Sequence, residues 1–403
     1  MNSVVLFQGQ GSYRTYYIRE LIEKKKELIL LWEKADDILG WSLLDLLLQT
    51  EDVGALPTNQ AQPMIFMMEY TAWCAYKDEL VKKPKYLAGH SLGELVALAA
   101  AEACSFEDSL RLVQARGDIM LQFSCKSNQG MISLQNCSAQ KAEALCDEAR
   151  KKTGKDIFCA NYNSLVQTVV SGEREALDYI KSIPHLEMRE LKVTKAFHTP
   201  LMRGAAEKYK EYLNDITFSY PQIAVVSNVI AKPYQTSWSI NQLLYEQIFS
   251  PVRWNDTMDY FKDKGMMVYL QATNSKLFRN MDVTSNQFYQ WGSLEELISN
   301  QILDFDRCYF EAYEDKSRGE ELCGEILKTM LSFPWDSSNE NDFTKAKEAY
   351  QKVKNLSKEI DLSKEQVSQC MDTLKDTLFA KGLSKDFADQ FCNDLLNKYR
   401  LCI

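Results

Sequence analysis

The sequence predicts an α/β protein with a large domain on a parallel sheet, a small ferredoxin-like unit inserted into that domain, and a helical C-terminal extension. A short apolar run that ends in a tight strand-to-helix turn at 89–93 indicates the large domain. A β-α-β-β-α-β order of patterns over 130–193 indicates the inserted unit. Charged, heptad-like sequence from about residue 301 indicates the extension. The large domain is predicted in two parts, over 1–126 and 195–300, with the inserted unit between them over 127–194. The extension is predicted over 301–403.

The turn at 89–93 has the pattern Gly-x-Ser-x-Gly, in which Ser91 stands between Gly89 and Gly93. Small residues flank the serine because the bend leaves no room for a Cβ atom at either position. Such an elbow is typical of an α/β-hydrolase-like domain, where the N-terminus of the next helix favours an oxyanion beside the serine. Ser91 is therefore a candidate nucleophile. An ordinary turn is the alternative, because short Gly/Ser patterns recur by chance.

The composition excludes several classes of function. The 403 residues carry a net charge of −9, which leaves no electrostatic footprint for a nucleic-acid partner. No apolar run approaches membrane-spanning length and no signal peptide precedes the first strand, so we expect a cytoplasmic protein without a membrane partner. The 11 cysteines form no Cys-x-x-Cys pair and have no histidine partners, which favours reduced thiols over disulfides or a metal site.

The first strand is predicted over Val4–Phe7, and the loop Gln8-Gly9-Gln10-Gly11-Ser12 follows it directly. This loop lacks the Gly-Lys-Ser/Thr ending of a phosphate-binding loop. It could offer a main-chain N–H to a substrate oxygen, although a plain β-turn is the simpler interpretation. Further along, Pro63 is predicted as the first residue of a helix that runs to about residue 80. Gln62 before it either points into a site or is solvated.

A helix predicted over 106–123, with Ser105 as its cap, carries Arg116 on an apolar stripe. Its neighbours at three and four positions are all apolar, namely Leu112, Val113, Ile119 and Met120. A guanidinium in such a place must reach solvent or meet an anion, because an unpaired buried charge is costly. From the residues alone, a structural carboxylate and a ligand's carboxylate are equally good candidates for that anion.

A serine nucleophile needs a base, and the chain has three histidines, His90, His185 and His198. His198 lies on a loop before a helix predicted to begin at Pro200, with Thr199 as its cap. His185 falls in the small unit and is expected at the surface. The His90 side chain should point away from the serine. His198 is therefore the candidate general base.

The rest of the chain adds structural elements. The second part of the large domain is predicted to hold a strand over 225–229, a helix over 250–261 and a last core strand over 267–270. The extension is predicted to hold two helical segments, over 304–331 and 344–400, which are separated by a polar link over 335–341. We expect the extension to be a solvated helical appendage without chemistry of its own.

Seven stretches, in family order, resemble the malonyl-CoA:acyl carrier protein acyltransferase family, which includes acyltransferases of polyketide synthases. They are Gly9–Ser12, Gln62-Pro63, Gly89–Glu94, Gln114–Gly117, Asn161–Ser164, Ala196–Met202 and Gln247–Trp254. The resemblance covers roughly residues 3 to 290, and the extension resembles those of free-standing enzymes that serve polyketide synthases in trans. The chain departs from the family at Gln271–Asn274, where a Gly-Pro pair is usual, and after Ser12, where a glycine is usual.

The resemblance implies that Ser91 is the nucleophile and His198 its general base. It also implies that the main-chain N–H groups of Gln10 and Leu92 form the oxyanion hole. Arg116 would then pair with the free carboxylate of a malonyl group.

Four more residues gain a role from the resemblance. Gln62 would support the arginine, and a main-chain carbonyl at or near Gln247 would orient the imidazole. Asn161 would line the site. Phe197 resembles members of the family that use unbranched malonyl units.

The implied reaction moves a malonyl group from malonyl-CoA, through a Ser91 ester, to the phosphopantetheine thiol of an acyl carrier protein, supplying a polyketide synthase in trans. The chain itself would hold no cofactor or metal. An editing hydrolase that frees acyl groups from carrier proteins is the alternative, but it would need no cation such as Arg116. An α/β-hydrolase with a full triad fits less well, because Asp178 and Glu190 lie in the inserted unit. A docking protein without catalysis is the third possibility.

Overall fold

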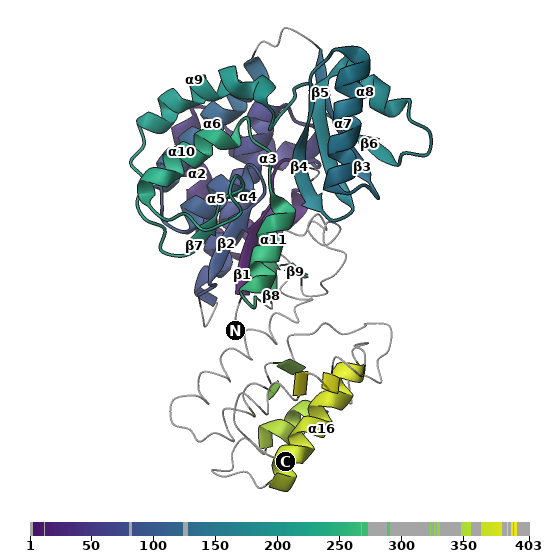
Figure 1. Ribbon diagram of the computed structural model, residues 1–403. Helices are drawn as coiled ribbons and strands as arrows, with labels where there is room; N and C mark the ends of the chain where they lie inside the picture. Colours follow the sequence, from purple (N-terminus) through teal and green to yellow (C-terminus); the bar gives the residue numbers. More distant parts are fainter. Residues whose placement is uncertain are drawn as a thin grey trace.

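The computed structural model shows a large α/β domain beside a smaller unit built on its own sheet (Figure 1). The structure describes residues 3–11, 13–79, 83–123, 128–266, 268–272 and 288–290, and parts of the C-terminal region at 323, 326–327, 329–330, 348–355, 364–380, 385, 388–389 and 391–392.

The large domain is organised on a parallel sheet with the strand order β7-β2-β1-β8-β9. These strands are β1 (Ser3–Phe7), β2 (Tyr86–Gly89), β7 (Ala224–Val226), β8 (Val268–Gln271) and β9 (Phe288–Gln290). Phe7 pairs with Gly89, so the loop after β1 and the turn after β2 leave the sheet at the same edge. The strand predicted over 267–270 is confirmed as β8, while β9, which pairs with β8 in parallel at the edge of the sheet, was not predicted.

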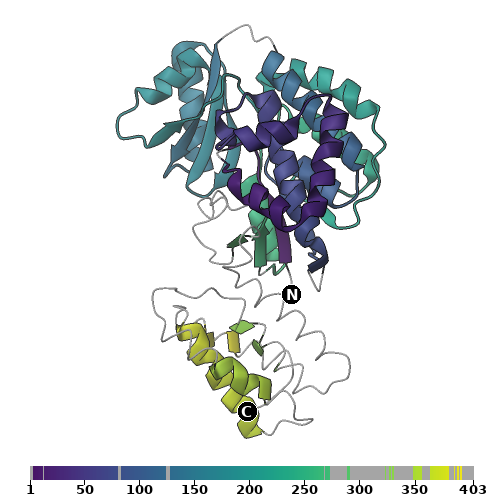
Figure 2. The same cartoon turned by 180° about the vertical axis from the view of Figure 1, so that it is seen from behind.

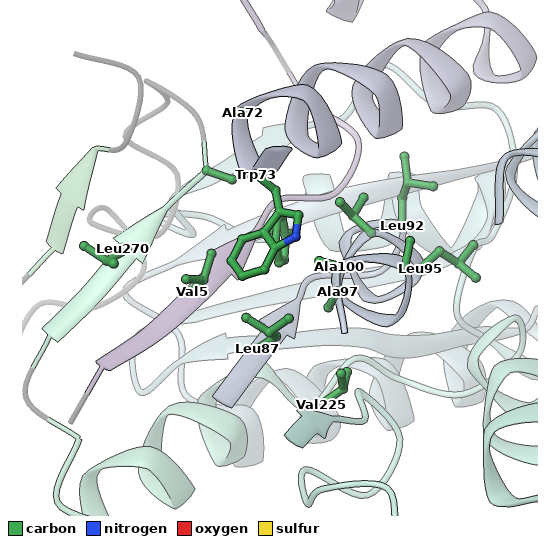
Figure 3. Packing of buried hydrophobic residues seen from close by; sticks show 14 of the residues in the cluster. Val5, Ala72, Trp73, Leu87, Leu92, Leu95, Ala97, Ala100, Val225 and Leu270 are labelled. Carbon is green, nitrogen blue, oxygen red and sulfur yellow. The ribbon is translucent and has the colours of Figure 1, made fainter. Parts of the chain in front are cut away.

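Side chains alternate between the two faces of this sheet, as the period of a strand requires. On one face, Val5 and Leu87 pack beneath helices α4 (Thr58–Tyr76) and α5 (Gly93–Ala100), with Trp73 of α4 pointing toward the strands (Figure 3). On the other face, Val4, Leu6, Ala88 and Val226 pack against helix α11 (Trp254–Asp263). The strands are therefore buried on both faces, which explains their continuous apolar sequence.

Further helices surround this core. They are α1 (Tyr16–Lys24), α2 (Ile29–Leu39), α3 (Leu43–Gln49), α6 (Phe106–Gln122), α9 (Arg203–Asn214) and α10 (Ser237–Gln247). In Figure 1 α11 lies in front of the sheet, and in Figure 2, the view from behind, the purple N-terminal helices lie nearest the viewer. The N-terminal helices and α11 therefore cover opposite sides of the domain.

Two predicted helix starts were wrong. Pro63 does not begin a helix but lies inside α4, which starts at Thr58. The missing N–H of proline costs the helix one hydrogen bond, and the burial of most of α4 in the core outweighs that loss. Pro251 does not begin α11 either, because Val252 extends beside β4 and exchanges backbone hydrogen bonds with Ala160 and Tyr162.

The smaller unit is a four-stranded antiparallel sheet in the order β4-β5-β3-β6. Its strands are β3 (Gln129–Gln135), β4 (Ile157–Ser164), β5 (Gln167–Glu173) and β6 (Met188–Glu190). Helices α7 (Ala139–Thr153) and α8 (Arg174–Lys181) pack against the sheet through a separate apolar cluster. The order along the chain and across the sheet is that of a ferredoxin-like unit, as predicted.

In the C-terminal region the structure describes helix α16 (Lys364–Ala380), which falls within a predicted helical segment. Cys370, Met371, Leu374 and Leu378 are its buried apolar residues, at the spacing of one helical face. The predicted link over 335–341 lies outside the described residues. Among the helices that are described, none has the length and apolar character needed to cross a bilayer.

Candidate active site

The turn after β2 raises Ser91 out of the backbone in a strained conformation. Ser91 has a φ of 55°, in the left-handed region that residues with a side chain seldom adopt. A Cβ at Gly89 would lie 1.9 Å from the carbonyl carbon of Gly93, and one at Gly93 would lie 2.3 Å from the carbonyl oxygen of Phe7. Both glycines are therefore required by close backbone contacts.

Asn228, just beyond β7, ties the two sides of this turn together. Its Oδ1 accepts a 2.6 Å hydrogen bond from the backbone N–H of Ser91, and its Nδ2 donates a 2.6 Å bond to the carbonyl of Gly89. Asn228 is buried, so both bonds are shielded from water. Sequence reasoning missed this residue, which is 137 positions away from Ser91 along the chain.

The predicted base lies beside the predicted nucleophile. The hydroxyl of Ser91 is 2.8 Å from Nε2 of His198, and Nδ1 of His198 is 2.9 Å from the main-chain carbonyl of Gln247. Because a carbonyl can only accept, Nδ1 carries the proton and Nε2 is left to accept one from the serine. The arrangement has the geometry of a nucleophile, a base and a group that orients the base.

His198 stands at a φ of 59°, immediately before the short 3₁₀ turn Pro200–Met202 that leads into α9. The predicted side-chain cap by Thr199 was wrong, because its hydroxyl donates instead to the carbonyl of Ala196, at 2.7 Å. Burial and the nearby charge of Arg116 lower the pKa of His198 to about 3. The imidazole is therefore neutral at physiological pH and free to take a proton.

Arg116 is 2% exposed and all its hydrogen-bond partners are neutral. Its Nη1 donates to Oε1 of Gln62 at 2.8 Å, while Nη2 donates to Oγ of Ser91 at 3.0 Å and to Oε1 of Gln247 at 3.2 Å. Nε has no partner, and no carboxylate of the described part of the chain lies within ion-pair distance of the guanidinium. Burial lowers the pKa of Arg116 to about 10, so the side chain keeps its charge at neutral pH.

Glu94 on α5 is a second ionisable group of the site, and sequence reasoning gave it no role. It is fully buried, and its carboxyl accepts hydrogen bonds from Tyr234, from Nε2 of Gln247 at 2.6 Å and from the N–H of Asn228 at 3.2 Å. Burial raises the pKa of Glu94 to about 7. Its apolar neighbours in the sequence are the same kind of signal that singled out Arg116.

The remaining predicted site residues lie near the serine to different degrees. Leu92 follows Ser91 at the N-cap of α5, and Gln10 lies in the loop after the neighbouring strand β1. Phe197 is buried directly before His198. Asn161 is buried in β4 and is joined to the large domain through its backbone bridge with Val252. No hydrogen bond among the described residues joins the side chain of Asn161 to the serine or the histidine.

His90 does not contact the serine hydroxyl but joins the two sheets. Its Nε2 is 3.0 Å from Oδ1 of Asn163 in β4, and burial lowers its pKa to about 4. Asn163 in turn donates to Oε1 of Gln167 at 2.9 Å. His185 is exposed at the end of the small unit, as predicted.

Comparison with known proteins places this site in a family. Residues 4–287 match the acyl transferase domain. The chain is 35% identical over 271 residues to the polyketide biosynthesis malonyl CoA-acyl carrier protein transacylase PksC of Bacillus subtilis, covering 66% of this chain and 90% of that protein. It is 34% identical over 269 residues to BaeC of Bacillus velezensis, which has the same description, with the same coverage of 66% and 90%.

Solved structures agree with these relatives. The crystal structure of FabD from Acinetobacter baumannii matches with a TM-score of 0.70 and 26% identity, over 76% of this chain and 98% of that one. A malonyl-transacylase solved in complex with its type II polyketide synthase acyl-carrier protein matches with a TM-score of 0.67 and 28% identity, over 72% and 95%. The chain therefore belongs to the acyl transferase domain family, and its relatives there are malonyl CoA-acyl carrier protein transacylases.

Proposed function

We propose that this protein transfers a malonyl group from malonyl-CoA to the phosphopantetheine thiol of an acyl carrier protein. One observation carries the proposal, which is that the Ser91 hydroxyl lies within hydrogen-bond distance of both His198 Nε2 and the buried Arg116 guanidinium. A nucleophile with a neutral base beside it suits attack on a thioester. A buried cation without a counter-ion suits a substrate that brings a carboxylate.

In the first half of the reaction, Ser91 Oγ attacks the thioester carbonyl while His198 Nε2 takes the hydroxyl proton. The oxyanion that forms is stabilised by the main-chain N–H groups of Gln10 and Leu92, which contribute about 3 kcal/mol for each donor. Collapse of the tetrahedral intermediate breaks the C–S bond, and His198 returns the proton to the CoA thiolate. The product is a malonyl-Ser91 ester.

Arg116 binds the far carboxylate of the malonyl group during this step. Its present bonds to Gln62, Ser91 and Gln247 hold the guanidinium beside the nucleophile before substrate arrives. In the second half, the carrier thiol gives its proton to His198 and attacks the ester, which restores the Ser91 hydroxyl. The kinetics are therefore ping-pong.

The carrier protein we propose belongs to a polyketide synthase that this chain serves in trans. The names of PksC and BaeC support this choice, and so does the structure of a malonyl-transacylase with a polyketide carrier protein. We place the activity in the cytoplasm, because the cysteines of the described residues are free thiols, as in a reducing compartment.

Intact-mass spectrometry tests the proposal directly. After mixing with malonyl-CoA the protein should gain the mass of one malonyl group, and Ser91→Ala should gain none. Addition of a phosphopantetheinylated carrier protein should move the group to the carrier. Release of free malonate at the same rate without a carrier would instead show a thioester hydrolase.

A further inference from the structure

Glu69, on α4, is a buried acid that the proposed mechanism does not use. Its side chain is 0% exposed. Oε1 accepts a 2.6 Å hydrogen bond from the backbone N–H of Gln8 and lies 3.4 Å from the hydroxyl oxygen of Tyr13. Oε2 has no partner, and neither does the nearby buried hydroxyl of Tyr17. The acid therefore lies directly beneath the loop that follows β1.

The surroundings of Glu69 favour its neutral form. No lysine, arginine or histidine of the described residues forms an ion pair with it, and the ionisable groups that face it are the hydroxyls of Tyr13 and Tyr17. Burial raises the pKa of Glu69 well above its usual range. The hydrogen bond from the Gln8 N–H needs an acceptor oxygen at this position, which an amide or a neutral carboxyl supplies as well as a carboxylate.

Glu69 and Tyr13 together hold the backbone of the loop on the side that faces α4. The Tyr13 hydroxyl donates a 2.6 Å bond to the carbonyl of Gly9, the residue next to Gln8. The Gln8 side chain is held as well, because its Nε2 donates to Oε1 of Gln271 at 3.2 Å.

The same loop also packs tightly against the elbow at 89–93. A Cβ at Gly9 would lie 2.3 Å from the carbonyl oxygen of His90, and one at Gly93 would lie 2.6 Å from the carbonyl oxygen of Gln8. The loop is thus fixed between the elbow and the acid of α4. Gln10, which follows, is the residue proposed above to offer its N–H to the oxyanion.

We propose that Glu69 is a positioning residue. Its hydrogen bond to the Gln8 N–H fixes the position of the Gln8–Gln10 backbone, and this orients the Gln10 N–H toward the oxyanion. The inference rests on the oxyanion role proposed for Gln10. It requires a hydrogen-bond acceptor at position 69 but no negative charge. An amide of the same shape should therefore replace the carboxyl, and an apolar side chain of the same length should not.

Two variants of the full chain test this requirement. Glu69→Gln should keep kcat within about threefold of the native value. Glu69→Met should lower kcat for malonyl transfer by about 10- to 100-fold, because a displaced oxyanion donor acts mainly in the transition state. KM for malonyl-CoA should change less than about twofold, because ground-state contacts to the malonyl group are intact.

A second measurement separates this inference from the choice of substrate. A fluorophosphonate ester phosphonylates a reactive serine: the Ser91 oxygen bonds to phosphorus, fluoride leaves, and His198 takes the proton, while the phosphoryl oxygen occupies the oxyanion hole. The rate should fall about 10-fold in Glu69→Met and stay native in Glu69→Gln. This readout holds even if malonyl-CoA is not the substrate, so failure of the proposed function would not hide failure of the inference.

Three results would overturn the inference: native kcat in Glu69→Met, an equal loss in Glu69→Gln, or a change confined to KM. Should Glu69→Met not fold, judged by circular dichroism, Tyr13→Phe takes its place. That variant removes the bond to the Gly9 carbonyl and leaves Glu69 intact. It should lower kcat and the phosphonylation rate by about 3- to 10-fold, and native values of both would equally contradict the proposal.

Discussion

At the scale of single residues, Arg116 is a buried cation that has no ion-pair partner among the described residues. It is buried among neutral oxygens, and its Nε donates to nothing in the described part of the chain. A cation in that state is stabilised most by a ligand that supplies an anion. The proposed preference for malonyl groups therefore depends on this one side chain.

Replacing that side chain tests the specificity. We expect Arg116→Ala to lower kcat/KM for malonyl-CoA by about 100-fold or more, because truncating one partner of a buried charge pair costs about 2–5 kcal/mol. Transfer from acetyl-CoA should fall far less, since acetyl has no carboxylate to lose. Arg111→Ala is the matched control, because Arg111 lies on the same helix but is exposed beside Asp108. Equal losses for both acyl groups in Arg116→Ala would remove the carboxylate clamp.

The pH dependence of the base is a second property at this scale. Because the pKa of His198 is lowered to about 3, the imidazole is already neutral throughout the range from pH 5 to 8. The kcat/KM of Ser91 acylation should therefore be nearly flat over that range, rather than falling below pH 6.5 as for an ordinary histidine. Stopped-flow acylation measures this profile.

Arg116 is one cause of the lowered pKa of His198, so its removal should move the acid limb upward. Acylation of both proteins by acetyl-CoA, followed down to about pH 3, supplies the comparison. An acid limb at the same pH in both proteins would mean that the guanidinium has no influence on the base.

At the scale of elements, the elbow joins β2 to α5 so tightly that Gly89 and Gly93 have no space for a Cβ atom. Its pattern could be predicted from the sequence because two glycines around a serine, after an apolar run, leave few other conformations. The start of α4 could not be predicted, because Pro63 looked like a local stop signal and burial of the helix overrode it. Nor was β9 predicted, because a strand of 3 residues at the edge of the sheet is too short to show a period in the sequence.

Steric crowding in the elbow predicts the effect of adding one methyl group. Gly93→Ala places a Cβ 2.3 Å from the Phe7 carbonyl oxygen and 2.6 Å from that of Gln8, both on backbone that is held in the sheet or beside it. We expect a loss of about 1–3 kcal/mol in unfolding free energy and a large loss of acylation. Gly11→Ala is the control for stability, because its Cβ would meet only Tyr13, at an ordinary 3.8 Å. Equal urea midpoints for the two variants would contradict this account of the turn.

At the scale of the whole molecule, the site is assembled from segments far apart in the chain. Ser91, Arg116, His198 and Gln247 could be selected in advance. Ser91 stands in the elbow pattern, Arg116 interrupts an apolar stripe, His198 is one of three histidines, and all four stand in stretches with a family resemblance. Asn228 could not, since its bond to Ser91 joins residues 137 positions apart. A polar residue next to a strand is not informative until its partner is known. Glu94 could have been selected by the signal that singled out Arg116, because its sequence neighbours are apolar.

Glu94 links this assembly to the stability of the whole fold. Its pKa is about 7 in the folded protein and near 4.5 when unfolded, so between these values the folded state holds a proton that the unfolded state has lost. Stability from this group therefore falls as pH rises from about 4.5 to 7, by up to about 3 kcal/mol. His90 and His198, with lowered pKa values, act in the opposite sense below pH 6.5.

Comparison of Glu94→Gln with the native protein isolates the carboxyl, because the histidines are common to both. The difference in unfolding free energy should shift in favour of the variant between pH 5 and pH 7.5, as measured by urea denaturation. A difference that does not vary with pH would show that Glu94 titrates as it does in the unfolded chain.

The left-handed backbone of Ser91 and His198 carries a cost that folding alone does not justify. Glycine would adopt both conformations without strain, so a lineage released from the need to catalyse would gain stability by losing its two most reactive side chains. Replacement of Ser91 or His198 by glycine would thus raise the free energy of unfolding while removing the reactive side chain. The proposed catalysis therefore carries a cost in stability at these two positions.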